Sequence, residues 1–271
     1  MVFDTSVSGV AALFPSQDGF SQVTTGATPS ACYIRRRMKP NNTRLRLNLG
    51  CGLRTHPDWV NVDGSWNARL ARHPLFRKVL CYLHLLTAEK ASVQWSRDVF
   101  IHDIRKPLPF PDCSADVVYA SHVLEHLYRE QAEKLALESF RVLAPGGIVR
   151  IIVPDLHAMI REYEGDSPFG ELSPAKKAIS PADLLNERLL MRSPSPPRNS
   201  FLLRVYEAWE DFHSHKWMYD EQSLTDLLRS AGFVDLAGRD YADSSIANIK
   251  DIEDASRIQN GAGVCIEGRK R

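Results

Sequence analysis

The stretch LRLNLGCG, Leu45 to Gly52, decides the fold class of this chain. Leu45, Leu47 and Leu49 alternate with polar residues, which predicts a strand with one apolar face. Gly50 and Gly52 follow at once, and glycine allows a turn with positive φ and a close approach of a ligand to the backbone. Backbone N–H groups at such a turn can hold a polar or anionic ligand. By itself, however, a Gly-x-Gly pair predicts only a turn.

Further apolar runs indicate alternating strands and helices. We predict strands at 59–62, 99–102, 116–120, 147–153, 234–239 and 263–267. One helix is predicted before Pro145-Gly146-Gly147, which would end it, and another between Asp220 as N-cap and Gly232. The expected fold is α/β, with a Rossmann-like seven-stranded, mostly parallel sheet and helices on both faces.

The chain is expected to divide into an extension and one large domain. Residues 1–43 are rich in Ser, Thr and Gly and are predicted to be a flexible N-terminal extension, followed by the domain over 44–271. Two stretches do not fit the strand–helix alternation. Residues 66–96 are predicted to be a helical insert. Residues 165–216 are too long for a plain connection and are predicted to be a cap or lid.

Composition narrows the function classes. The 271 residues carry a net charge of +1, so no global field attracts nucleic acid or an acidic membrane surface. The five cysteines are widely spaced, which argues against a disulfide framework or a zinc site and favours a reducing cytoplasm. No apolar run approaches the roughly 20 residues that span a bilayer. The N-terminus has no basic region typical of a signal peptide. We therefore expect a cytoplasmic protein without membrane contact.

Two acidic residues follow later strands. Asp63 ends the second predicted strand in VNVDG, where an acid can accept both hydroxyls of a ribose. Asp103 follows the third strand in HDIRKPLPF, where a carboxylate can accept from an exocyclic amine, and Ile104 can pack on a flat base. Each Asp can equally be a turn or helix cap. Together with the glycine turn, three such features at successive strand ends favour a nucleoside site.

The motifs LNLGCG, VNVDG, LPFPDCSADVVYASHVLEHL and FRVLAPGGIVRIIVPDL resemble the successive motifs of class I S-adenosylmethionine-dependent methyltransferases. The resemblance covers roughly residues 44–156 and implies S-adenosyl-L-methionine (SAM) as cofactor. It implies these roles: Asn48, Leu49, Gly50, Cys51 and Gly52 around the methionine part, Asp63 on the ribose, Asp103 and Ile104 at the adenine, and Ser121 and His122 facing the sulfonium and the acceptor. Because Gly52 and Asp63 are close in sequence, we expect the first crossover to be a brief turn.

Methyl transfer is an in-line displacement, so the main task of the protein is alignment. A general base is needed only for a hydroxyl or a protonated amine. His122 and His126 are the candidate catalytic residues, with Glu125 between them and His213 and His215 further along. The spacing H-x-x-E-H also occurs in inverted zinc proteases, where it lies within a helix. Here a strand precedes it, so we expect no metal site.

The favoured function is methyl transfer to a small-molecule or sugar-type acceptor. A nucleic-acid methyltransferase, a protein methyltransferase and a non-catalytic cofactor-binding partner module remain as alternatives. A nucleic-acid enzyme would show a basic stripe with stacking aromatic residues, and only the cluster Arg35–Lys39 hints at one. A dinucleotide-dependent oxidoreductase is disfavoured because Thr55 replaces the third glycine of G-x-G-x-x-G. The sequence does not indicate the oligomeric state.

Overall fold

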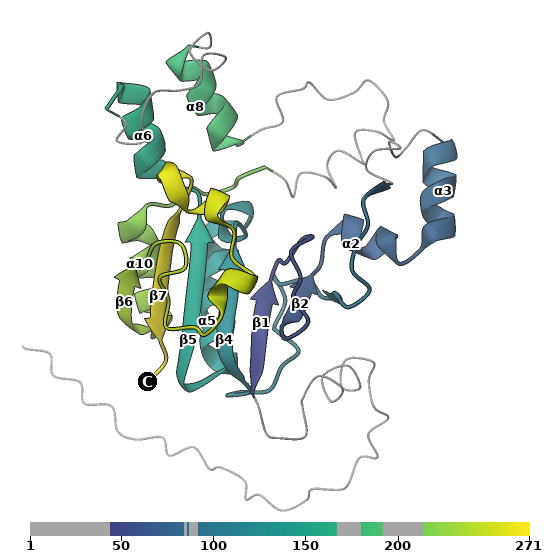
Figure 1. The fold of residues 1–271 in the computed structure, drawn as a ribbon, viewed down its shortest axis with the longest axis horizontal. Helices are drawn as coiled ribbons and strands as arrows, with labels where there is room; N and C mark the ends of the chain where they lie inside the picture. Colours follow the sequence, from purple (N-terminus) through teal and green to yellow (C-terminus); the bar gives the residue numbers. More distant parts are fainter. Residues whose placement is uncertain (1–43, 84–85, 87–91, 167–179, 192–213) are drawn as a thin grey trace, which may run out of the picture.

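A computed structural model describes residues 44–83, 86, 92–166, 180–191 and 214–271. Its centre is a seven-stranded sheet in the order β3-β2-β1-β4-β5-β7-β6 (Figure 1). The strands are β1 (Leu45–Leu49), β2 (Val60–Asp63), β3 (Phe100–Ile101), β4 (Ala115–Ser121), β5 (Leu143–Val153), β6 (Val234–Gly238) and β7 (Val264–Arg269). Strands β1 to β5 pair in parallel, whereas β7 is antiparallel to both β5 and β6. This arrangement confirms the predicted mostly parallel α/β sheet.

The strand order places a change of direction at the centre of the sheet. The chain runs outward from β1 to β2 and β3, then returns to form β4 on the other side of β1, with Leu49 opposite Ala120. In open α/β sheets, ligands bind at the carboxyl ends of the strands at such a switch point. The glycine turn follows β1 and therefore lies at this point.

The helices differ in places from those expected. The main ones are α2 (Trp66–Ala71), α3 (Pro74–Tyr82), α5 (Arg129–Val142), α6 (Leu156–Glu164), α8 (Pro181–Leu189) and α10 (Glu221–Ser230). The prediction that Pro145-Gly146-Gly147 ends a helix was wrong, because α5 already ends at Val142 and these residues lie within β5. The β4–β5 register shifts beside them, which is the mark of a bulge, and a bulge tolerates proline in a strand.

One face of the sheet is covered by α5 and α10. Leu47, Val118 and Val149 of the strands pack with Leu135 of α5 and Leu224 of α10 in one buried cluster. Figure 1 shows both helices on the same side of the sheet. This cluster is the main hydrophobic core.

The opposite face is covered by the covering segment, defined here as residues 239–262. Its 3-10 turns η3 (Ile249–Asp251), η4 (Ala255–Arg257) and η5 (Gln259–Gly261) lie over the sheet in place of long α-helices. Ile249 and Ile252 pack with Trp59, Tyr119 and Ile152 in a second buried cluster. Short turns suffice because the apolar side chains, rather than the helical backbone, cover the strands.

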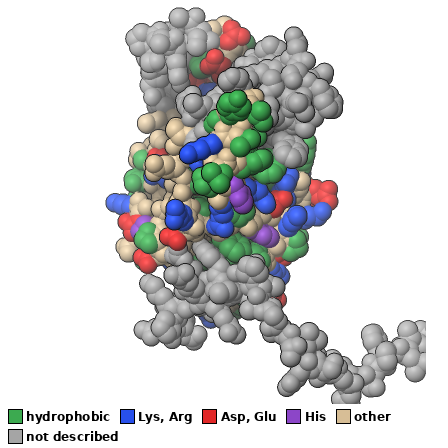
Figure 2. Space-filling view, turned by 90° about the vertical axis from the view of Figure 1, so that its right-hand side faces the viewer, with side chains coloured by type: hydrophobic (Ala, Val, Ile, Leu, Met, Phe, Trp, Pro, Cys, Tyr) green, Lys and Arg blue, Asp and Glu red, His purple; other side chains and the backbone are tan. Residues whose placement is uncertain are grey.

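The predicted insert begins as two helices, α2 and α3, and residues 84–85 and 87–91 lie outside the described part. No side chain of α3 is buried, and Leu75, Phe76 and Tyr82 are all exposed. Figure 2 views the side of the molecule on which α2 and α3 lie, and shows hydrophobic side chains near Lys, Arg and His side chains, with acidic ones also present.

Only part of the predicted cap is described. α8 lies beside α6, and Arg188 of α8 forms an ion pair with Glu162 of α6. The extension over 1–43 and the stretches 167–179 and 192–213 lie outside the described residues, as do His213 and the cluster Arg35–Lys39. Of the helices that are described, none is long and apolar enough to cross a membrane.

Candidate functional site

The glycine turn closes tightly at the end of β1. Gly50 has φ +63° and Gly52 has φ +52°, so both occupy the left-handed region. The turn is held by a hydrogen bond from the Cys51 N–H to the Val62 carbonyl, at 3.0 Å. A Cβ at Gly50 would lie 2.5 Å from Cγ2 of Val123, whereas a Cβ at Gly52 would meet no atom within 4 Å. Gly50 therefore serves close packing, and Gly52 faces open space.

The residues that lead into the turn are largely buried. The Asn48 side-chain amide donates to the Arg54 carbonyl at 2.9 Å and to Oδ1 of Asn61 at 3.1 Å, which fixes the loop after the turn. Leu49 has its side chain in the main core, so only its backbone is available to a ligand. Burial raises the pKa of the Cys51 thiol well above its ordinary value, so Cys51 is a neutral, apolar neighbour.

Asp63 lies directly against the glycine turn. Its Oδ2 accepts a hydrogen bond from the Gly52 N–H at 2.9 Å, and its Oδ1 accepts from the Ser65 N–H at 2.8 Å. The brief turn expected between β1 and β2 is what allows this contact. Each carboxylate oxygen retains a further lone pair, so the group can also accept from hydroxyls.

Asp103 and Ile104 follow β3 on the same edge of the sheet. Asp103 accepts from Nε and Nη2 of Arg105, both at 2.8 Å, and this guanidinium lowers the pKa of the Asp103 carboxyl. Ile104 is partly buried against the main core. An incoming amine would therefore share the Asp103 carboxylate with Arg105.

Ser121 and His122 lie at the end of β4, next to the glycine turn across the switch point. His122 has φ +56°, a strained conformation for a non-glycine residue of the kind that clusters at functional sites. Its Nε2 lies 3.2 Å from the Arg257 carbonyl, and burial lowers the pKa of His122 to about 4. His122 is therefore neutral near pH 7.

The covering segment adds residues that sequence reasoning missed. A small pocket between β1 and β4 is lined by Gly50, Cys51, Tyr119, Ser121, Ile252 and Arg257. The Arg257 Nη1 donates to the Ser121 carbonyl at 3.0 Å, and Arg54 pairs with Asp254 across the pocket. Arg257 lies 136 residues from Ser121, so no local pattern could have placed it here.

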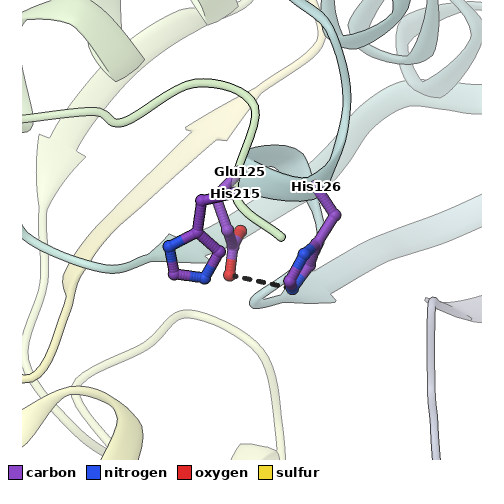
Figure 3. A group of neighbouring side chains, drawn as sticks. All are labelled: Glu125, His126 and His215. Carbon is purple, nitrogen blue, oxygen red and sulfur yellow. Dashed lines mark ion pairs between the residues drawn. The ribbon is translucent and has the colours of Figure 1, made fainter. Parts of the chain in front are cut away.

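His126, the second candidate catalytic residue, belongs to a separate group. In the 3-10 turn η1 (Leu124–His126), Glu125 is fully buried, and its Oε1 lies 3.4 Å from Nδ1 of His122 and 3.8 Å from Nε2 of His126. The imidazole rings of His126 and His215 are 5.0 Å apart (Figure 3). Burial raises the pKa of Glu125 to about 8 and lowers that of His215.

Sequence comparison finds a partial match to a known domain in the middle of the chain. Residues 77–151 match the family model of a methyltransferase domain, which includes β3, β4 and α5 but not the glycine turn. A relative from Mycolicibacterium smegmatis named "Probable S-adenosylmethionine-dependent methyltransferase" is 38% identical over 69 residues. That match spans 26% of this chain and 26% of the relative's own length. These matches confirm the resemblance to SAM-dependent methyltransferases.

Solved structures of the same kind are more distantly similar. A SAM-dependent methyltransferase of Thermotoga maritima, described as a "possible histamine N-methyltransferase", is 17% identical, with 89% of each chain covered and a TM-score of 0.41. Human N-acetylserotonin methyltransferase in complex with SAM is 14% identical, with 88% of this chain and 51% of that chain covered and a TM-score of 0.38.

Proposed function

We propose that this protein transfers a methyl group from SAM to a small-molecule or sugar-type acceptor. The observation that carries the proposal is the contact between Asp63 and the glycine turn at the switch point of the sheet. This contact places the Asp63 carboxylate, which can accept from ribose hydroxyls, beside the open space at Gly52. A bound nucleoside requires both an acceptor for its hydroxyls and room beside the backbone. The matched methyltransferase domain supplies the reaction class.

The residues present fit this cofactor. The open space at Gly52 leaves room for a ligand beside the backbone. Each carboxylate oxygen of Asp63 accepts one backbone hydrogen bond and can accept a second one from a ribose hydroxyl. Asp103 and Ile104 are proposed to hold the adenine, and Asn48, Leu49, Gly50 and Cys51 to border the methionine part. This last contact uses the Leu49 backbone, because the Leu49 side chain lies in the core.

When bound, SAM supplies a methyl group already activated by its positive sulfur. The chain then has to align the acceptor with that methyl and exclude water. Ser121 and His122 are proposed to lie beside the acceptor, since Ser121 ends β4 and lines the pocket and His122 follows it directly. Arg257 and the Arg54–Asp254 pair line the pocket and narrow the space beside Ser121, which favours a small acceptor over a folded macromolecule.

The proposal is tested by calorimetry with S-adenosylhomocysteine, the demethylated product, on wild type and Asp63→Ala. We expect the Kd of the variant to be at least tenfold higher. The carboxylate would accept from the ribose hydroxyls, and it also accepts the hydrogen bond from the Gly52 N–H that fixes the turn. Asp116→Ala is the matched control, because Asp116 pairs only with exposed Arg44 on the described surface. Urea unfolding of both variants separates a binding loss from a folding loss. An unchanged Kd in a folded Asp63→Ala protein contradicts the proposal.

A further inference from the structure

Glu125, His126 and His215 form a compact group outside the pocket described above. One ligand atom from each lies within 4.8 Å of the others, and Figure 3 shows the Glu125 carboxylate between the two imidazole rings. Glu125 is 0% exposed and His215 is 6% exposed. The group joins the turn η1 to a segment that lies 90 residues further along the chain.

Several polar atoms of this group have no hydrogen-bond partner among the described residues. They are both carboxylate oxygens of Glu125 and the Nδ1 of His215, all of them buried. A buried polar atom without a partner costs about 1–3 kcal/mol, and more if it is charged. The two unpartnered oxygens of Glu125, which lie between the two imidazole rings, indicate that a positively charged species belongs beside this carboxylate.

The hydrogen bonds around the group determine which ring nitrogens carry lone pairs. The His126 Nδ1 lies 3.3 Å from the Ser214 carbonyl, so it carries the proton and leaves the Nε2 lone pair facing Glu125. The Nε2 of His122 likewise donates to the Arg257 carbonyl, which leaves its Nδ1 lone pair 3.4 Å from Oε1 of Glu125. Lone pairs thus face the carboxylate from two sides.

The backbone holds this arrangement in place. The Lys216 N–H donates to the Glu125 carbonyl at 2.6 Å, and the His215 N–H donates to the Leu190 carbonyl at 2.9 Å. A ligating histidine usually donates its second ring N–H to a carbonyl, as His126 does here. In a tetrahedral zinc site, neighbouring ligand atoms are about 3.4 Å apart. The 3.8 Å between His126 Nε2 and Glu125 Oε1 is close to this value, and the other ligand atoms, which lie within 4.8 Å of one another, must move closer when the ion binds.

We propose that Glu125, His126 and His215 bind a divalent metal ion, with zinc as the ion that this donor set suits best. Two imidazoles and one carboxylate are the protein ligands of a zinc site with an open fourth position. This site shares no residue with the proposed SAM contacts. From the H-x-x-E-H motif at 122–126 it uses Glu125 and His126, and His215 takes the place of His122. It would tie the residues before α10 to the end of β4, beside His122.

The test is zinc titration of the full-length protein after treatment with a chelator, followed by calorimetry in the absence of SAM. We expect one zinc ion per chain, and cobalt substitution is expected to give the visible absorption of a tetrahedral site. Glu125→Gln and His215→Ala are each expected to weaken zinc binding at least tenfold. His157→Ala, which removes an exposed histidine on α6, is the matched control and is expected to bind zinc as wild type does.

Thermal unfolding without metal shows whether the variants are folded. Zinc is expected to raise the Tm of wild type and His157→Ala but not of Glu125→Gln. If wild type binds no zinc, or if Glu125→Gln and His215→Ala bind it as tightly as wild type, the metal site is overturned. If wild type binds no zinc, Glu125 is instead protonated and its proton lies between the carboxyl group and the imidazole lone pairs. S-adenosylhomocysteine binding by the same variants is measured separately, so failure of the metal site leaves the proposed function testable.

Discussion

Gly50 and Gly52 share a backbone conformation but differ in surroundings. Both have positive φ, yet only Gly50 packs against another side chain, that of Val123. The sequence pattern does not distinguish the two glycines, because it does not show which of them packs against another side chain. At the scale of one residue, the structure gives Gly50 a role in packing and leaves open space beside Gly52.

Alanine substitution is expected to separate these two roles. Gly52→Ala should lower the free energy of unfolding by about 1–2 kcal/mol, which is the strain of a left-handed alanine. Gly50→Ala should add the clash with Val123, a further cost of about 1–3 kcal/mol. Urea unfolding monitored by circular dichroism measures both. Equal losses would show that Val123 moves aside, contrary to the role given to Gly50.

At the scale of elements, α10 shows how local signals fix a helix. Asp220 accepts from the Ser223 N–H at 2.8 Å, and the Ser223 hydroxyl accepts from the Asp220 N–H at 3.0 Å. This reciprocal pair is a capping box, and it confirms Asp220 as the predicted N-cap. Gly232 follows the helix with φ +102°, as expected for a residue just beyond a helix end.

Asp220→Ala is expected to lower the free energy of unfolding by about 1 kcal/mol, because the first turn loses its cap. Hydrogen bonds from Ser223 lower the pKa of Asp220 in the folded state. This contribution is therefore complete above the pKa of about 3.9 for unfolded aspartate and is lost as the pH falls further. Urea unfolding at pH 7 and pH 3 measures the difference from wild type. Ser230→Ala, at the exposed end of α10, is the control and should change little; an equal loss there would exclude a capping effect.

At the scale of the whole molecule, one buried arginine connects the sheet to the covering segment. Arg150 of β5 is 0% exposed and pairs with Glu253 at 2.8 Å and with Glu267 at 3.2 Å. It also donates to the carbonyls of Asp240 and Asp243. The covering segment in turn supplies Arg257 and Asp254 to the pocket, so this network also positions one wall of the candidate site.

Arg150→Met is expected to lower the free energy of unfolding by about 3–5 kcal/mol, because two carboxylates remain buried without their partner. Adding Glu253→Gln should recover part of this loss, since one of those charges is then removed. Arg44→Met breaks an exposed pair and should cost at most about 1 kcal/mol. Chemical denaturation of the four proteins measures these values. A loss no greater than that of Arg44→Met would mean that water reaches the network.

Most of the parallel half of the fold could be predicted from short patterns. Alternating or continuous apolar runs report burial within one segment, so the strands were placed to within a few residues, apart from β5, which begins four residues early. The helical insert was expected as one helix and begins as two, because Pro74 starts a new helix. Bulges such as the one at Pro145 depend on the neighbouring strand and leave no local signal.

By itself, the sequence determined the strand–helix order, the glycine turn and the acidic residues that end successive strands. These depend on interactions within about ten residues, which periodicity and turn chemistry report directly. Only the tertiary structure decided that Arg257 lies against Ser121 and that His215 lies beside Glu125. Such contacts join segments about 90 to 136 residues apart, and their formation depends on how whole elements pack rather than on any pattern near either residue.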